Sequence, residues 1–201
     1  WTFDDIDTNT TVYDRSGYGN NGIWNGTGSR YETLTTGERV GSFNGVNDMI
    51  RSFNSQSLKE KPHVTIAAWV NPNLLIGVEV RNIKIKGAYI WGTALSITNS
   101  GKIHIEMGVN PSACARLNGV KSIYINEWSF VTYTYDAQHQ KSYINGKIDK
   151  SQTETRSRVL NNDHVGISDW GNYWWSGSLD DVRIYNRALS ANEISQIYNA
   201  T

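Results

Sequence analysis

The sequence of 201 residues lacks several features that would mark a particular class of protein. Cys114 is its only cysteine, so the chain forms no internal disulfide and no zinc site built on cysteine pairs. Prolines occur only at positions 62, 72 and 111, which leaves no proline-rich linker. No apolar run approaches the roughly 18 residues that a membrane-spanning helix needs, so we expect no membrane insertion.

An excess of charge of one sign is also missing. Lysine and arginine number 19, as do aspartate and glutamate, so the formal net charge at pH 7 is zero. Nucleic-acid-binding proteins usually carry a basic excess, and polybasic membrane anchors need one. We therefore expect no nucleic-acid partner. The chain begins at Trp1 rather than at methionine, from which we expect a processed protein or an excised module.

The sequence is rich in aromatic and turn-forming residues, with 8 tryptophans, 11 tyrosines and 18 glycines. This composition is typical of β proteins with polar loops. Several segments alternate apolar and polar residues with the period of two that indicates half-buried strands. The segments are residues 64–70, 103–107, 128–136 and 178–186. The dipeptide Asn145–Gly146 predicts a two-residue hairpin turn between two further strands.

One helix is expected, at the C-terminal end of the sequence. Ser190 is a suitable N-cap, and Glu193 completes a capping box three residues later. Ile194, Ile197 and Tyr198 then form an apolar stripe at helical spacing. Many antiparallel strands with one short C-terminal helix predict an all-β antiparallel β-sandwich, or jelly roll, in a single domain over residues 1–201.

Four blocks of the sequence resemble the laminin-G-like, concanavalin A-like jelly-roll domains of secreted microbial proteins. The blocks are WTFDDIDTNTTVYDRSGYGNNGIWNG (1–26), SFNGVNDMI (42–50), VTIAAWVNP (64–72) with EWSFVTYTYD and KSYINGK (127–147), and WSGSLDDVRIYNRALSANEISQIYN (175–199). The resemblance implies a concanavalin A-like jelly roll, from a family that includes glycan-binding modules, adhesion domains and domains without a known ligand. Residues 74–92, 107–120 and 169–175 match no shared motif, and loops of this kind decide ligand choice.

The resemblance also implies a structural calcium ion, Ca²⁺, where the first and last strands of related domains lie together. The carboxylate at the start of the last strand would be Asp180, with Asp14 and Asn21 of an early loop nearby. In the predicted strand Asp180 shares a face with Val182 and Ile184, where a carboxylate is costly unless it is paired or metal-bound. The alternative is that Asp180 accepts hydrogen bonds from backbone amides or from an arginine.

A second oxygen-rich pair, Asn47 and Asp48, resembles the paired ligands of the pentraxin branch, where calcium bridges to the bound ligand. Both are therefore candidate ligand-binding residues, and Asp48 is also a candidate calcium ligand. A later loop would add Ser168 and Asp169. The alternative is that Asp48 is a turn residue that hydrogen-bonds the local backbone.

A sugar site needs aromatic rings that stack on the C–H faces of the sugar, interleaved with amides and carboxylates that bond its hydroxyls. The segment DWGNYWW at residues 169–175 has this composition, and YIWG at 89–92 is a second candidate. The alternative is that several of these rings close the end of the core. The candidate ligand-binding residues are thus Asp169, Trp170, Asn172, Tyr173, Trp174, Trp175 and Trp91, together with Asn47 and Asp48.

No catalytic constellation is evident. Glycoside hydrolases use two carboxylates that flank the scissile bond, about 5–10 Å apart. Glu106 is the lone acid of its predicted strand, and the adjacent Asp180 and Asp181 face opposite sides. His104 is expected on the solvated surface, and no H-E-x-x-H or G-x-S-x-G motif occurs. Arg116, Arg156 and Arg158 are also expected there, the alternative being that they pair with a carboxylated sugar.

The sequence therefore predicts a non-catalytic carbohydrate-binding module with a structural calcium ion. Its partners would be a polysaccharide or glycan and further domains of a larger multidomain protein, and its location extracellular or at the cell surface. One alternative is a protein-interaction, adhesion or spacer domain without a sugar ligand. The other is a small glycoside hydrolase.

Overall fold

The computed structural model describes residues 1–4, 10–52, 57, 62–75, 80–85, 92–110, 112–159, 165–168 and 174–200, with the backbone alone for 80–85. Its strands are β1 (Thr11–Val12), β2 (Gly22–Asn25), β3 (Arg30–Thr33), β4 (Arg39–Asn44), β5 (Met49–Ser52), β6 (Val64–Pro72), β7 (Val80–Ile85), β8 (Thr93–Thr98), β9 (Lys102–Asn110), β10 (Ala113–Ser122), β11 (Ser129–Tyr135), β12 (His139–Ile144), β13 (Lys147–Thr153), β14 (Gly166–Ile167) and β15 (Ser176–Tyr185). The helix α1 (Ala191–Ala200) follows them.

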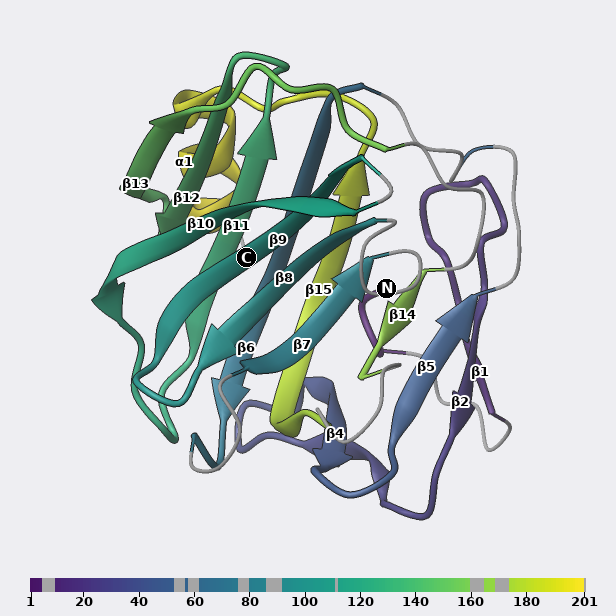
Figure 1. The fold of residues 1–201 in the computed structure, drawn as a ribbon. Helices are drawn as coiled ribbons and strands as arrows, with labels where there is room; N and C mark the ends of the chain where they lie inside the picture. Colours follow the sequence, from purple (N-terminus) through teal and green to yellow (C-terminus); the bar gives the residue numbers. More distant parts are fainter. Residues whose placement is uncertain are drawn as a thin grey trace.

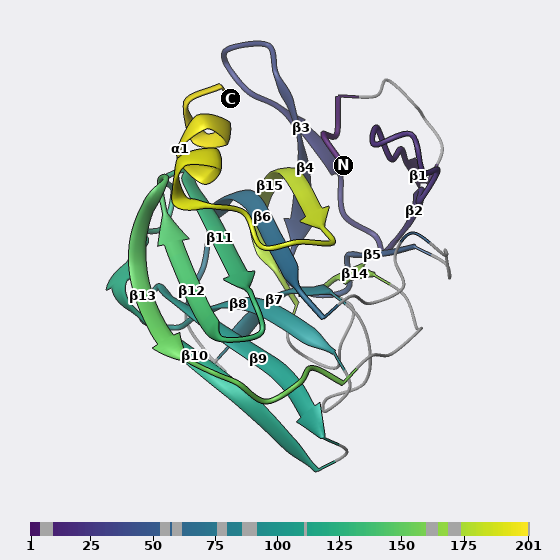
Figure 2. The same cartoon turned by 90° about the horizontal axis from the view of Figure 1, so that it is seen from above.

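The strands form two facing layers. One layer is the long sheet, with the order β13-β12-β11-β6-β15-β4-β3. The other is made of the β5 sheet, β1-β2-β5-β14, and the β9 sheet, β10-β9-β8-β7, which stand edge to edge because β14 contacts β7 (Figures 1 and 2). All the described pairings are antiparallel, which confirms the predicted jelly-roll sandwich.

The core lies between the layers and follows from alternation along each strand. Val64, Ile66, Ala68 and Val70 of β6 are all buried in the main cluster, together with Ile103, Ile105 and Met107 of β9 and Val131, Tyr133 and Tyr135 of β11. The opposite face of β6 and β11 is buried as well. There Trp69 packs against Phe130 and Tyr198, at ring-centre distances of 5.4 and 5.6 Å, so α1 covers that face.

The predicted hairpin and helix signals are confirmed. Asn145 and Gly146 have φ values of 51° and 73°, the positive values that the turn between β12 and β13 requires. Ser190 N donates to Glu193 Oε2 over 2.8 Å and Glu193 N donates to Ser190 Oγ over 3.3 Å, which is the capping box at the start of α1. In the described part of the chain, no helix has the length and apolar character needed to cross a bilayer.

Strand β15 contains a bulge that the sequence analysis missed. Asp180 pairs with Trp69 and Arg183 pairs with Ala67, so two residues of β15, at positions 181 and 182, stand opposite one residue of β6. Asp181 has a φ of 48°, which makes the extra residue possible. The bulge shifts the alternation by one position. Asp180 therefore shares a face with Trp69 and not with Val182 and Ile184, and the predicted face was wrong.

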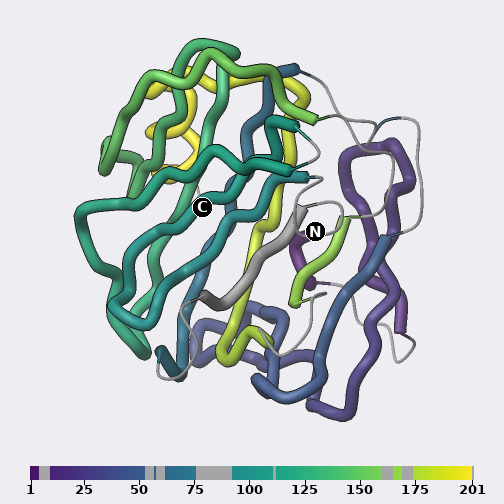
Figure 3. The backbone as a smooth tube through the Cα atoms, in the orientation of Figure 1, coloured from purple at the N-terminus to yellow at the C-terminus, as the bar shows by residue number. Residues whose placement is uncertain are grey.

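The start of the chain runs beside this bulge. The N-terminus lies close to β15 (Figure 3). The backbone nitrogen of Trp1 donates to the Val182 carbonyl over 2.8 Å, and Val182 N donates to the Trp1 carbonyl over 3.0 Å. Trp1 Nε1 also donates to the Asn20 carbonyl over 3.0 Å. The first and last segments of the chain thus lie together, as the resemblance implied.

Trp175 belongs to the core rather than to a ligand platform. Its side chain is 1% exposed, and its backbone nitrogen donates to Ser168 Oγ over 2.7 Å. A ring enclosed in this way has no face open to a sugar, so we withdraw Trp175 from the candidate ligand-binding residues.

Substituting the two adjacent tryptophans separates these roles. Trp175→Ala should lower the free energy of unfolding by about 3–5 kcal/mol, because it leaves a large cavity between the layers. Trp174→Ala should cost clearly less, because Trp174 is only half-buried. Denaturant unfolding of both variants tests this, and equal losses of stability would contradict the core assignment of Trp175.

Candidate functional site

The outer face of the β9 sheet, which points away from the long sheet, carries a cluster of polar side chains. Because Ile103, Ile105 and Met107 face the core, His104 and Glu106 must face outward. On the neighbouring strand β10, Ala115 and Leu117 face the core, so Arg116 and Asn118 face outward. The register places Arg116 opposite Glu106 and Asn118 opposite His104. We call these four residues the outer-face cluster.

Direct contacts join the four side chains of the outer-face cluster. Arg116 Nε donates to Glu106 Oε1 over 2.8 Å. His104 Nδ1 lies 2.6 Å from Asn118 Oδ1, and His104 Nε2 lies 3.8 Å from Glu106 Oε1. The Arg116 side chain is 52% exposed, whereas those of Glu106 and His104 are 22% and 14% exposed. The cluster thus presents an exposed guanidinium and amide above a more enclosed carboxylate and imidazole.

The charges in the outer-face cluster stabilise one another. The imidazole of His104 and the guanidinium of Arg116 lower the pKa of Glu106 to about 2, against the opposing effect of burial. Burial disfavours the charged imidazole, but bonding to Glu106 and Asn118 outweighs it and raises the pKa of His104 above its ordinary value. Glu106 is therefore ionised at any physiological pH, and His104 gains its proton more readily than a free imidazole.

The sequence alone does not bring these residues together, because Glu106 is the lone acid of its strand and Arg116 and His104 are predicted as separate surface residues. Arg116 comes 10 residues after Glu106 and Asn118 comes 14 residues after His104, and only the hairpin register of β9 and β10 aligns them. The residues Asn-Pro-Ser-Ala at positions 110–113 are typical of a turn, and this pattern could have indicated the hairpin from the sequence.

Asn47 and Asp48 serve the fold. Asp48 is fully buried, and its two carboxylate oxygens accept from Gly28 N and Asn44 N over 2.8 and 2.9 Å. Asn47 Oδ1 accepts from Asn44 Nδ2 and Thr27 Oγ1 over 2.9 and 3.0 Å. Their side-chain oxygens thus hold two turns together, which for Asp48 agrees with the alternative of a turn residue, and we withdraw both residues from the ligand set.

Asp14 and Asn21 also serve local structure. The Asp14 carboxylate accepts from Ser16 N over 2.8 Å, and from Asn20 N and Asn20 Nδ2 over 2.8 and 2.9 Å. Asn21 Oδ1 accepts from Asp14 N over 2.9 Å. These bonds close the loop of residues 14–21 on itself. The side-chain oxygens of Asp14 and Asn21 thus already have a structural role within this loop.

Asp180 fits a cation better. Burial, followed by the nearby carboxylates of Asp181 and Asp4, raises the pKa of Asp180 to about 7. Asp181 N donates to Asp180 Oδ1 over 2.7 Å. Asp181 itself is paired with Arg183 Nη2 at 2.7 Å. Among the described residues no three acidic, histidine or cysteine side chains converge, so any metal here would rely on carbonyl oxygens as well.

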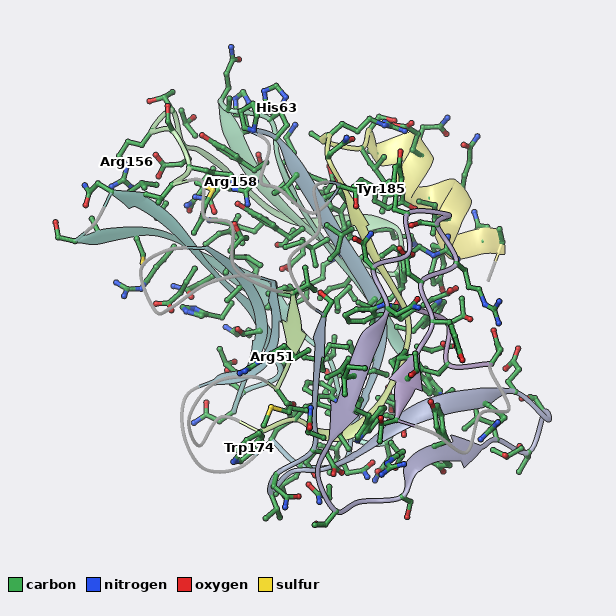
Figure 4. All side chains as sticks on the ribbon, turned by 90° about the vertical axis from the view of Figure 1, so that its right-hand side faces the viewer. Arg51, His63, Arg156, Arg158, Trp174 and Tyr185 are labelled. Atoms are coloured by element: carbon green, nitrogen blue, oxygen red, sulfur yellow. The ribbon has the colours of Figure 1, made fainter. Side chains whose placement is uncertain are left out.

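The aromatic loop is described only at its end. Asp169, Trp170, Asn172, Tyr173 and Trp91 lie outside the described residues. Trp174 is half-buried and lies toward the opposite end of the molecule from Arg156 and Arg158 (Figure 4). Arg158 is 7% exposed and donates from Nη2 to Thr93 Oγ1 over 2.9 Å, so the expectation that it is a solvated arginine was wrong.

A family model, described as the concanavalin A-like lectin/glucanases superfamily, matches residues 43–195. A search of curated protein sequences finds no match.

Several solved structures share the fold. Domain 4 of AbnA, an extracellular GH43 arabinanase from Geobacillus stearothermophilus solved with arabinotriose, is 22% identical with a TM-score of 0.74, over 98% of this chain and 95% of that one. The binding domain of Paraclostridial Mosquitocidal Protein 1 is 19% identical with a TM-score of 0.75, over 97% of this chain and 50% of that one. The binding domain of botulinum neurotoxin DC, solved with rat synaptotagmin II, is 16% identical with a TM-score of 0.75, over 99% and 50%. The chain thus spans about half the length of these toxin binding domains.

The half-buried carboxylate of Asp180 predicts a stability that falls as pH rises. Its folded-state pKa of about 7 lies above the unfolded value of about 3.9, so the folded state binds more protons between these values. Stability contributed by the protonated carboxyl is full below about pH 4 and is lost as pH rises through about 7. Asp180→Asn should therefore raise the Tm in EDTA at pH 8 by more than about 2 °C, and should leave it unchanged at pH 4.

Asp181→Asn is the matched control, because asparagine tolerates the positive φ at this position but loses the contact with Arg183. Because it also removes one of the charges that raise the pKa of Asp180, it should raise the Tm at pH 8 by less than Asp180→Asn does. Thermal melts from pH 4 to 8 measure both variants. If the Tm of Asp180→Asn and that of the parent protein change with pH in parallel, the charged carboxylate of Asp180 does not destabilise the fold.

Proposed function

Because the chain belongs to the concanavalin A-like lectin/glucanase superfamily, we propose that it is a carbohydrate-binding module of a larger extracellular or cell-surface protein. The observation that carries the proposal is the outer-face cluster. It gathers a carboxylate, a guanidinium, an amide and an imidazole on the face of one hairpin. These planar groups supply the donors and acceptors that sugar hydroxyls need.

Each member of the outer-face cluster has a definable role toward a saccharide. Glu106 accepts hydrogen bonds from hydroxyls, and Arg116 donates to ring and hydroxyl oxygens. Asn118, which is exposed, does both. The contacts with Glu106 hold Arg116 in place before the ligand arrives, so binding immobilises little more. With few groups and competing water, we expect a Kd on the order of 10 µM to 1 mM.

Stacking would come from the aromatic loop. Trp174, Trp170 and Tyr173, with Trp91, remain the candidate rings, and Asp169 and Asn172 the candidate polar partners beside them. Trp174 is the member whose half-exposed position supports this role. The loop and the outer-face cluster would then serve either one extended glycan or two separate chains.

The proposed module binds without catalysis. Hydrolysis of a glycosidic bond needs a second carboxylate beside the first. Glu106 is the only acid in the sequences of β8, β9 and β10, and its lowered pKa makes it a poor proton donor. Its role would be to keep a neighbouring domain close to a polysaccharide and so to raise the effective concentration.

Glycan binding is tested by removing the donors of the outer-face cluster. Arg116→Ala and Asn118→Ala should each weaken binding of the best ligand from a polysaccharide screen by about fivefold or more, with little change in Tm. Arg187→Ala is the matched control, because Arg187 is a similarly exposed arginine paired with Glu193 on the helix side of the molecule. Isothermal titration calorimetry measures the three variants.

Unchanged affinity in both cluster variants would place the site elsewhere, with Trp174→Ala the next variant to measure. The absence of any bound glycan would favour the protein-interaction or adhesion alternative. Trypsin digestion and circular dichroism establish that each variant is folded.

We further propose that a calcium ion binds at Asp180, with Asp4 and Asp181 as neighbouring carboxylates. The raised pKa of Asp180 supports this, because a bound cation would offset the cost of burying its charge. When bound, the ion would neutralise these carboxylates where the first and last segments of the chain meet.

Calcium should raise the Tm of the EDTA-treated protein at pH 8. At about 100 times the Kd, the gain in unfolding free energy is about 2.7 kcal/mol, a rise in Tm of roughly 5–10 °C. Asp180→Asn should abolish the response. Asp14→Asn should lower the Tm but keep the response, because Asp14 closes its own loop. No shift with calcium in the parent protein would refute the metal site.

A further inference from the structure

We propose that the outer-face site selects acidic glycans, those that carry uronate, sialic acid or sulfate groups. This inference rests on the proposed glycan binding and names the class of ligand. It follows from an uneven distribution of charge between the β9 sheet and the rest of the molecule.

The β9 sheet is basic although the whole chain is neutral. Its four strands contain the basic residues Arg81, Lys84, Lys102, Arg116 and Lys121, and the single acidic residue Glu106. The remainder of the chain therefore holds fourteen basic and eighteen acidic residues. An anionic ligand would be attracted to this sheet and repelled by the rest of the molecule.

The outer face of the β9 sheet gathers part of this charge. Lys102 is two residues before His104 on β9, and residues at this spacing lie on the same face of a strand. Arg116 lies on the next strand. The described outer positions of β8, β9 and β10 hold two cationic side chains, Lys102 and Arg116, as well as His104. They hold one carboxylate, that of Glu106. The face thus keeps a positive charge after the Arg116–Glu106 pair is formed.

The exposed fractions of the two paired side chains indicate that Arg116, and not Glu106, contacts the ligand first. The Arg116 side chain is 52% exposed and that of Glu106 is 22% exposed, so an approaching saccharide reaches the guanidinium first. A guanidinium pairs with carboxylate or sulfate through parallel hydrogen bonds. Glu106 engages Nε and so fixes the plane of the guanidinium, which makes Glu106 a positioning residue.

His104 adds to the same preference. Its imidazole lies between Asn118 and Glu106, at 2.6 and 3.8 Å, with Arg116 the other charged group that faces it from β10 and Ser96 its neutral partner on β8. Gain of a proton at mildly acidic pH would increase the positive charge of the face. The exposed guanidinium of Arg116 and the protonation of His104 therefore both favour binding of an anion.

The experiment compares saccharides that differ only in charge. The pairs are an oligogalacturonate with its methyl ester, a sialylated oligosaccharide with its desialylated form, and a sulfated oligosaccharide with its desulfated form. Titration calorimetry at pH 7 should show, for at least one pair, about tenfold tighter binding of the acidic member. Raising NaCl from about 50 to 300 mM should weaken that binding at least about threefold.

Charge-removing variants locate the effect. Lys102→Gln should weaken binding of the acidic member about twofold to fivefold, and Arg116→Gln should weaken it more. Lys147→Gln is the matched control, because it removes an exposed lysine from β13 in the long sheet. A loss with Lys147→Gln equal to that with Lys102→Gln would assign the preference to net charge and overturn the site.

The two levels of the proposal fail differently. Neutral members that bind as tightly as acidic ones would overturn the inference and leave the carbohydrate-binding module intact. A protein that binds none of the six saccharides, and no neutral polysaccharide, would overturn the proposed function and the inference with it. If Lys102→Gln and Arg116→Gln leave the preference for an acidic saccharide unchanged, the inference is also overturned.

Discussion

The site depends on which face of strand β9 is buried. Ile103, Ile105 and Met107 are fully buried against the long sheet, and this fixes His104 and Glu106 on the outer face. A slip of one residue in the register would bury two polar groups and expose three apolar ones, so the core specifies the register strongly. The hairpin to β10 then brings Arg116 to Glu106. The chemistry of the outer face is thus a consequence of how the inner face packs.

The long sheet shows the same constraint with a local exception. Along β6 and β11 one face packs between the layers and the other packs under α1, so both are buried. In β15 the bulge at positions 181 and 182 changes the alternation. It turns Asp180 away from the main core while Val182 remains in it. The half-buried carboxylate at this position is the feature that supports a cation.

Much of the fold was predictable from the sequence because it rests on local patterns. The period of two in residues 64–70, the Asn145–Gly146 turn and the capping box at Ser190 each depend on neighbours within a few residues. The bulge was not predictable in the same way, since the sequence SLDDVRIY alternates plausibly in either phase. Only the pairing of β15 with β6 and with Trp1 decides between them.

The candidate site was less predictable than the fold, and for a physical reason. Clusters within single segments of the sequence pointed to Asp48 and Trp175, but both side chains are buried and serve the fold. The outer-face cluster is instead assembled across two strands, and no single segment shows it. Charge patterning gave no indication either, because the basic β9 sheet is balanced by acidic residues elsewhere in a neutral chain.

The most direct test of the account is to locate the bound glycan by NMR chemical-shift mapping with the ¹⁵N-labelled protein. The account predicts that titration with the best-binding saccharide shifts the backbone amides of β9 and β10 around His104 and Arg116, together with the Arg116 Nε–H signal. Shifts confined to the β5 sheet, the long sheet or the helix, with β9 and β10 unchanged at saturation, would contradict it.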